Sequence, residues 1–308
     1  MEQEKIFARL LPIITRYYRE QGSGPFVDYL DPDDLDERLQ LDNGGGRQDW
    51  EELFTWVEQY LRHAVKTGHP GYVNRMWADA NLPSVIGEMI TAITNTSACT
   101  YETAPVSTLM EKYLLRTMLE LAGFENGSAQ MTTGSSNANM IAMMAARNTR
   151  DAAIKRSGLS GRPQLYGFVN ADAHYSMDRA ANILGIGIEN LIKVPVDDHG
   201  RMTGPALEAA IETVRAAGGE VFFVAATAGT TVRGAYDPLE PLIALRARHG
   251  FWLHVDGAYG LPAAAAWGAV ALAAALLWAL VGRQGLTLPD FRPVNWLIDV
   301  RSGWPMFW

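Results

Sequence analysis

The sequence predicts an α/β domain built on a mostly parallel β-sheet, and residues 221–260 carry most of that prediction. Residues 221–226 are apolar at every position, as expected for a strand with both faces covered. Residues 239–248 have helical spacing and precede Gly250, a residue type that commonly ends helices. Residues 251–255 form a second apolar run. Strand, helix and strand in this order predict a parallel pair joined by a right-handed crossover.

The same alternation extends upstream. Strands are expected at residues 165–169 and 191–196, and a helix at residues 205–217. The core positions of that helix are expected to be Leu207, Ala210, Ile211 and Val214.

The first part of the chain predicts helices separated by a linker. An amphipathic helix is expected near the N-terminus, with Ile6, Leu10, Ile13, Ile14 and Tyr17 on one face. Residues 22–48 are rich in Gly, Asp and Pro and are expected to be a loop or linker, and residues 50–61 resume a helical pattern. A further helix ends before Gly123, and its apolar stripe is assigned to the core: Leu109, Met110, Tyr113, Leu114, Met118 and Leu121.

The composition of the chain argues against several kinds of partner and site. The chain has 308 residues and a formal charge of -8, without a Lys/Arg-rich run, which argues against nucleic acid as a partner. Cys99 is the single cysteine and the six histidines are scattered, so neither an intrachain disulfide nor a metal site is expected. The N-terminus lacks the apolar core of a secretory signal, and we expect a cytoplasmic protein that is not bound to a membrane.

Two polar residues are expected at the edge of the sheet where ligands bind. Thr227 and Asp256 follow the strands at 221–226 and 251–255, and open α/β sheets bind ligands beyond the carboxyl ends of their strands. A buried aspartate requires a cationic partner, such as the protonated nitrogen of a bound heterocycle. The alternative is a turn aspartate that bonds only to backbone, as in many Asp-Gly pairs.

A phosphate site is expected where a Gly/Ser loop leads into the helix predicted at 137–147. Gly134, Ser135 and Ser136 lie at its start, where backbone N–H groups and the helix dipole favour an anion. The alternative is an N-cap without a ligand.

Five segments, in this order, carry a family resemblance: residues 95–113, 131–147, 170–180, 226–238 and 254–260. Together they resemble the group II pyridoxal phosphate (PLP) dependent amino-acid decarboxylases, in the branch with glutamate and cysteine-sulfinate decarboxylases. The resemblance covers residues 68–262. It implies the large domain of the aspartate aminotransferase-like fold (fold type I), with PLP as cofactor and a homodimer as the assembly.

The resemblance also implies roles for single residues. Gly134, Ser135 and Ser136 would hold the cofactor phosphate, although Ser135 replaces a glycine of the family. His174 would stack on the ring and assist proton transfer, Thr227 would lie near the phenolic oxygen, Asp256 would face the ring nitrogen, and Ala258 would lie under the ring. Without the resemblance, His174 reads as a capping or surface residue, and Thr227 and Ala258 as capping and packing residues.

The implied activity is decarboxylation of an L-amino acid to an amine and CO2, with an acidic substrate such as glutamate or aspartate. Arg75 could pair with an acidic side chain in a bidentate contact, or be an ordinary surface arginine. Ser97 is the other candidate substrate residue, and with Cys99 it departs from the family pattern. The alternatives are a non-catalytic remnant of the fold, or another PLP enzyme such as an aminotransferase or lyase.

The resemblance ends after Pro262. The family continues to a His-Lys pair whose lysine forms the Schiff base with PLP, but no lysine follows Asp256 here; the lysines are Lys5, Lys66, Lys112, Lys155 and Lys193. A candidate Schiff-base lysine is therefore absent, and we expect the chain alone to be inactive. The small C-terminal domain of the family is also missing from the sequence.

These observations divide the chain into three expected parts: an N-terminal helix and linker (1–48), a PLP-binding large domain (49–262) and an atypical apolar tail (263–308). Residues 261–282 carry no charge and are long enough to span a bilayer, but no basic cluster flanks them. A frameshifted or misassembled gene end is the favoured interpretation of the tail, ahead of a buried alanine-rich helix and of a membrane anchor.

Overall fold

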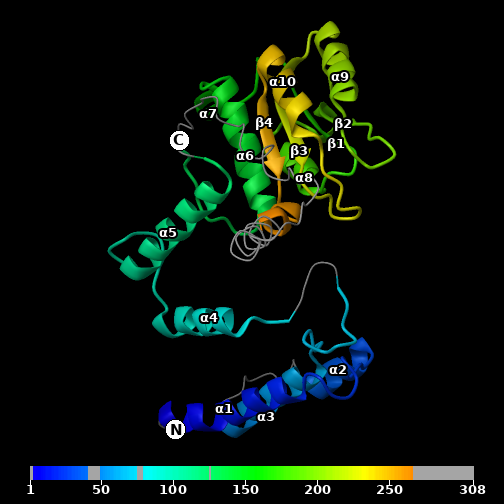
Figure 1. Cartoon of the computed structure of the whole chain (residues 1–308). Coiled ribbons are helices and arrows are strands. Elements are labelled where there is room, and N and C mark those ends of the chain that lie inside the picture. The colour runs from blue at the N-terminus through cyan, green and yellow to red at the C-terminus, as the bar shows by residue number, and fades with distance from the viewer. Residues whose placement is uncertain (1–2, 41–48, 75–78, 125, 266–308) are drawn as a thin grey trace, which may run out of the picture. The chain divides into compact units, whose positions relative to one another are not determined.

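The computed structural model describes residues 3–40, 49–74, 79–124 and 126–265 (Figure 1). The chain divides into two compact units, Met1–Ala104 and Pro105–Trp308. The tail expected at 263–308 lies outside the described residues from 266 onward, and the boundaries expected at residues 48 and 262 stay predictions. Among the described residues, no helix combines the length and the apolar character needed to cross a membrane.

The N-terminal unit is helical. Its elements are α1 (Gln3–Glu20), α2 (Pro32–Leu39), α3 (Trp50–His63) and α4 (Leu82–Thr94). The two helices predicted here are confirmed as α1 and α3, which are joined by the ion pair of Arg16 and Glu58 at 2.8 Å. The linker prediction is wrong over α2, because Pro32 occupies the first helical turn and two acidic residues follow it, a combination that starts a short helix.

The C-terminal unit alternates helices and strands. Its elements are α5 (Pro105–Leu121), α6 (Ser135–Arg150), α7 (Ile154–Ser157), β1 (Leu165–Asn170), α8 (Ser176–Ile183), the 3₁₀ helix η1 (Ile188–Asn190), β2 (Leu191–Val194), α9 (Gly204–Ala216), β3 (Glu220–Thr227), α10 (Leu239–His249) and β4 (Trp252–Asp256).

The four strands form one parallel sheet in the order β2-β1-β3-β4. This confirms the predicted α/β class, and every predicted strand is present within a residue or two. Side chains of β1 alternate between the two faces of the sheet: Val169 packs in one core cluster and Phe168 in the other. In β3 the register shifts at Phe222, and Phe222 and Phe223 pack in the same cluster.

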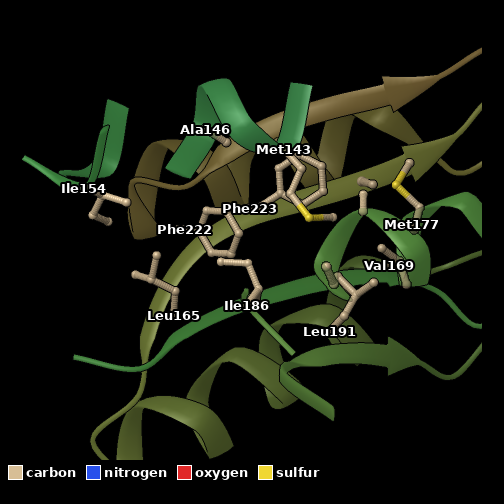
Figure 2. Close-up of a cluster of buried hydrophobic side chains, with 13 residues drawn as sticks. Met143, Ala146, Ile154, Leu165, Val169, Met177, Ile186, Leu191, Phe222 and Phe223 are labelled. Atoms are coloured by element: carbon tan, nitrogen blue, oxygen red, sulfur yellow. The ribbon is translucent and has the colours of Figure 1, made fainter. Parts of the chain in front are cut away.

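Helices cover both faces of the sheet, which explains why the strands are apolar throughout. On one face Met143 and Ala146 of α6 and Met177 of α8 pack on Phe222 and Phe223 of β3 (Figure 2). On the other face α9 and α10 contribute Leu207, Ile211, Leu242 and Leu245, all buried. The predicted core positions Leu207, Ile211 and Val214 are confirmed, while Ala210 is partly buried and packs against this cluster.

The core assignment of the α5 stripe is wrong. The helix is present, but all six residues of the stripe are exposed, and no residue of α5 is buried. Helical periodicity identifies an apolar face without identifying what covers it. Within the described residues of the C-terminal unit, that face stays uncovered.

Asp237 joins three segments at the carboxyl end of the sheet. Its Oδ1 accepts hydrogen bonds from the Asn170 side chain (2.7 Å) and the Met202 backbone N–H (2.6 Å), and its Oδ2 accepts one from the Thr227 N–H (2.7 Å). The residue is buried, and burial raises the pKa of its carboxyl group. The ends of β1 and β3 and the loop that contains Met202 therefore depend on one side chain.

We predict that Asp237→Ala lowers the free energy of unfolding by about 3 kcal/mol or more, because it leaves two buried backbone N–H groups and one side-chain amide without their acceptor. Urea unfolding monitored by circular dichroism measures the change. Asp198→Ala removes an exposed carboxylate nearby and should stay within about 0.5 kcal/mol of the parent. Equal effects of the two substitutions would contradict this role of Asp237.

Candidate active site

The carboxyl ends of β3 and β4 place two predicted residues side by side. Thr227 and Asp256 are register partners in the parallel ladder, and both are buried. The Ala228 N–H donates to the Asp256 carbonyl at 2.8 Å and continues the pairing past the strand ends. The predicted location of both residues at the carboxyl edge of the sheet is therefore confirmed.

The Asp256 carboxylate is held by neutral groups. Its Oδ2 accepts from Nδ2 of Asn139 at 2.9 Å, and its Oδ1 accepts from the Ala258 N–H at 3.2 Å. Among the described residues no arginine or lysine forms an ion pair with it. A buried carboxylate without a cation is costly, and a positively charged ligand group at this edge would stabilise it.

The start of α6 lies at the same edge, since Asn139 in its second turn reaches Asp256. Gly134 is the N-cap and has φ 92°, a left-handed conformation that favours glycine. A side chain at Gly134 would meet nothing within 4 Å, so the approach to the helix start is open. Ser135 and Ser136 are exposed there. The first N–H groups of a helix have no intrahelical acceptor, which suits this point to a phosphate.

His174 lies in the loop between β1 and α8. Its Nδ1 is 2.9 Å from Oγ of Ser176 and accepts from the Ser176 backbone N–H at 3.2 Å. The ring lies 4.2 Å from that of Tyr175, which in turn carries the Arg179 guanidinium at 4.5 Å. The imidazole is thus anchored through one nitrogen.

Three residues that the sequence analysis missed connect these parts. Nδ2 of Asn139 donates to Oγ of Ser176 at 3.0 Å as well as to Asp256, and Oδ1 of Asn139 lies 2.8 Å from Nε2 of His254. Asn139 and Ser176 are buried. The sequence signal that could have identified Asn139 is a polar residue on the core side of an apolar helix, one turn after the predicted phosphate loop.

Burial lowers the pKa of His254 to about 4, and the nearby Asp256 carboxylate opposes that shift. Part of the residue's surface stays accessible, but the ring stacks on Phe223 with centroids 5.9 Å apart, and its Nε2 faces Asn139. His254 is therefore neutral at pH 7.

The remaining predicted residues are placed as follows. Ala258 is exposed two residues after Asp256. Ser97 belongs to the N-terminal unit, where its hydroxyl donates to Sγ of Cys99 at 3.2 Å. Arg75 lies outside the described residues. Lys193, which the sequence does not assign to the site, forms an ion pair with Asp178 at 2.7 Å. The described part of the chain contains no cluster of metal-ligating side chains.

These positions suit PLP by their own chemistry. The open helix start fits a phosphate, the buried carboxylate fits a pyridinium N–H, and both lie at the ligand-binding edge of one parallel sheet. The class defined by this fold and site is that of the fold type I PLP-binding domains.

The comparison with known families gives the narrower assignment. The pyridoxal-dependent decarboxylase conserved domain matches residues 32–265, and the chain belongs to this family. The resemblance inferred from the five sequence segments is thereby confirmed.

Individual relatives agree with this assignment. The chain is 38% identical over 229 residues to the acidic amino acid decarboxylase GADL1 of Bos taurus, which covers 74% of this chain and 44% of the relative. It is 37% identical to the cysteine sulfinic acid decarboxylase of Homo sapiens, over 76% of this chain and 47% of the relative. The crystal structure of mouse CSAD in apo form matches with a TM-score of 0.80 at 34% identity, over 83% of this chain and 55% of that one. The chain thus spans less than half the length of these two curated relatives.

We predict that His254 makes the stability depend on pH between about 6.5 and 4. Below pH 6.5 the unfolded chain binds a proton at this histidine while the folded chain does not. The free energy of unfolding therefore has its full value above pH 6.5 and falls by up to about 3 kcal/mol as the pH reaches 4.

Unfolding free energies measured across this range check the prediction. His254→Gln keeps an amide donor for Asn139 and removes the titration, so its loss of stability over the range should be smaller than that of the parent. His199→Gln, at an exposed position, should keep the parent's slope. Identical slopes for His254→Gln and the parent would show that His254 is not responsible.

Proposed function

We propose that the C-terminal unit binds PLP and serves the α-decarboxylation of an acidic L-amino acid. The observation that carries the proposal is Asp256, a buried carboxylate at the ligand edge of the sheet that bonds to an amide and a backbone N–H and to no cation among the described residues. A pyridinium N–H supplies the missing positive charge. Family membership supports the same cofactor.

PLP, when bound, withdraws electrons from the carbon that loses the carboxylate. The residues of this chain would bind and orient it. Asp256 keeps the ring nitrogen protonated, and the N–H groups at the start of α6, with Ser135 and Ser136, hold the phosphate. His174 packs against the ring, with its unanchored Nε2 free to exchange a proton with the substrate. In the proposed arrangement Thr227 and Ala258 border the ring.

An acidic substrate is favoured by the relatives, whose names specify acidic amino acids and cysteine sulfinic acid. Arg75 is the proposed partner of the acidic side chain and Ser97 a second substrate contact. A guanidinium binds a carboxylate or a sulfinate in the same bidentate way, so Arg75 would favour acidic over neutral amino acids without separating the acidic ones.

A second candidate function follows from the positions of the lysines in the sequence. No lysine follows Asp256 in the sequence, so the covalent anchor of the cofactor has no candidate at the expected place. We propose that the chain by itself releases little or no CO2, and that a non-catalytic PLP-binding role is the alternative function. A cytoplasmic location, expected from the sequence, is part of the same proposal.

We further propose that the chain assembles as a homodimer. An apolar surface hollow of α5 is not covered by other described residues of the C-terminal unit; it is lined by Val106, Leu109, Met110, Tyr113 and Leu114. Exposed apolar patches commonly mark protein interfaces. Sedimentation velocity should give a dimer, and Met110→Asp, which places a charge in the hollow, should shift the mass towards the monomer. A monomeric parent would refute this part.

The cofactor proposal is tested by titrating the full chain with PLP and following absorbance. We predict saturable binding at one site, weakened about tenfold or more by Asp256→Ala, because a charge-assisted hydrogen bond is lost. Asp198→Ala is the matched control and should bind as the parent does. Equal binding by the parent and Asp256→Ala would overturn the proposed cofactor site.

The reaction is tested by CO2 release from glutamate, aspartate, cysteine sulfinate and leucine with the PLP-loaded chain. Release should be negligible without methylamine and should rise when methylamine is added in place of the missing lysine amine. The rise should occur for the acidic substrates only and should exceed that of Asp256→Ala with PLP. Substantial release without methylamine would disprove the proposed inactivity. A PLP-binding chain that shows no release under either condition would favour the non-catalytic alternative.

A further inference from the structure

A single carboxamide connects the two residues proposed to contact the cofactor ring. Asn139 reaches Asp256 through Nδ2 at 2.9 Å and Ser176 through the same nitrogen at 3.0 Å. Ser176 in turn lies 2.9 Å from Nδ1 of His174. Asp256 and His174 come from different segments of the chain, and Asn139 lies on a third, so the link exists only in the folded unit.

The orientation of this amide follows from charge. An ionised carboxylate only accepts hydrogen bonds, so the NH2 group of Asn139 must face Asp256 and its oxygen must face His254. Nε2 of His254 then carries the hydrogen and donates to Asn139 at 2.8 Å. Since His254 is neutral at pH 7, its other nitrogen is unprotonated there.

The orientation extends to His174. The Ser176 hydroxyl accepts from Asn139, which leaves its own hydrogen for Nδ1 of His174. The Ser176 backbone N–H also points at that nitrogen, at 3.2 Å. With Nδ1 an acceptor, a neutral His174 carries its hydrogen on Nε2. The network therefore has a direction, from His254 through Asn139 and Ser176 to His174, with a branch to Asp256.

We propose that Asn139 is a positioning residue of the cofactor site, which orients the Asp256 carboxylate directly and the His174 imidazole through Ser176. The inference rests on the proposed function, because it takes Asp256 and His174 to be the residues that contact PLP. Burial supports it: Asn139 and Ser176 are 3% and 2% exposed, so no solvent molecule can replace the amide freely.

The first experiment needs no cofactor. Asn139→Asp puts a second carboxylate beside Nε2 of His254, so it should raise the pKa of His254 well above the value of about 4 in the parent. NMR titration of the unloaded full chain, with His254 assigned from the His254→Gln spectrum, measures this. An unchanged His254 titration would overturn the network geometry, whatever the cofactor does.

The second experiment measures PLP binding in a double-mutant cycle. Asn139→Leu, similar in size, should weaken binding about tenfold, the effect of losing a hydrogen bond to a charged group. In an Asp256→Ala background the same substitution should weaken binding only a few-fold, as Ser176→Ala does, because the contact with Asp256 is already lost and only the branch to His174 remains. Equal effects in the two backgrounds would show a merely structural role and overturn the inference.

A spectroscopic measurement distinguishes an effect of Asn139 on the orientation of Asp256 from a general loss of protein stability. With PLP labelled with ¹⁵N in the ring, the parent should show a protonated ring nitrogen, and Asn139→Leu should shift that signal towards the unprotonated position. Ser176→Ala breaks only the branch to His174, so it should leave the ring nitrogen signal in place while weakening binding a few-fold. Ser176→Ala also provides the test if Asn139→Leu does not fold; binding equal to the parent's would then refute the His174 branch.

Asn148→Leu is the matched control. It makes the same change on α6, at an amide that bonds to the neighbouring Arg147, and should leave PLP binding and the ring signal unchanged. Failure of the parent to bind PLP would refute the proposed function. The His254 titration would still show whether the hydrogen-bond network of Asn139 exists. Binding by the parent together with an unaffected Asn139→Leu would refute the inference and leave the proposed function standing.

Discussion

The proposed site depends on a carboxylate that is buried and that pairs with no opposite charge among the described residues. Asp256 ends β4 where the sheet is covered by helices on both faces, and the described residues offer it an amide and a backbone N–H. These donors offset part of the desolvation cost, but neither carries a charge. In the proposed function, the helix start, His174 and Thr227 act together around a cationic ring bound by this carboxylate.

The surrounding loops are fixed by polar contacts of the same kind. Asp237 ties the end of β1 to the end of β3, and Asn139 ties α6 to β4 and to the start of α8. Each contact joins segments far apart in the sequence, 117 residues in the case of Asn139 and Asp256. Loops at a ligand edge have few apolar contacts of their own, so buried hydrogen bonds determine where their side chains lie.

Family membership and catalytic competence are separate questions for this chain. The fold and the family domain reach residue 265, while the covalent anchor expected for PLP has no lysine after Asp256. In the proposed site, binding of the ring and phosphate would depend on Gly134, Asp256 and the hydrogen-bond network of Asn139. A lysine in addition holds the cofactor covalently and speeds its exchange with a substrate amine. The proposed inactivity and the proposed cofactor site can therefore both hold.

The sequence by itself determined the local elements and the family. Apolar runs and helical spacing are properties of neighbouring residues, so the strands, α6, α9 and α10 could be placed within a few residues, and the ordered segments led to PLP and to Asp256. The tertiary structure decided which polar groups meet and which apolar faces are covered. Asn139, Ser176 and His254 lie within the segments that carry the resemblance, but nothing in the sequence shows that their side chains meet. The α5 stripe has the periodicity of a core helix yet is exposed. Periodicity defines a face of an element, whereas contacts between distant segments depend on packing that only the folded chain contains.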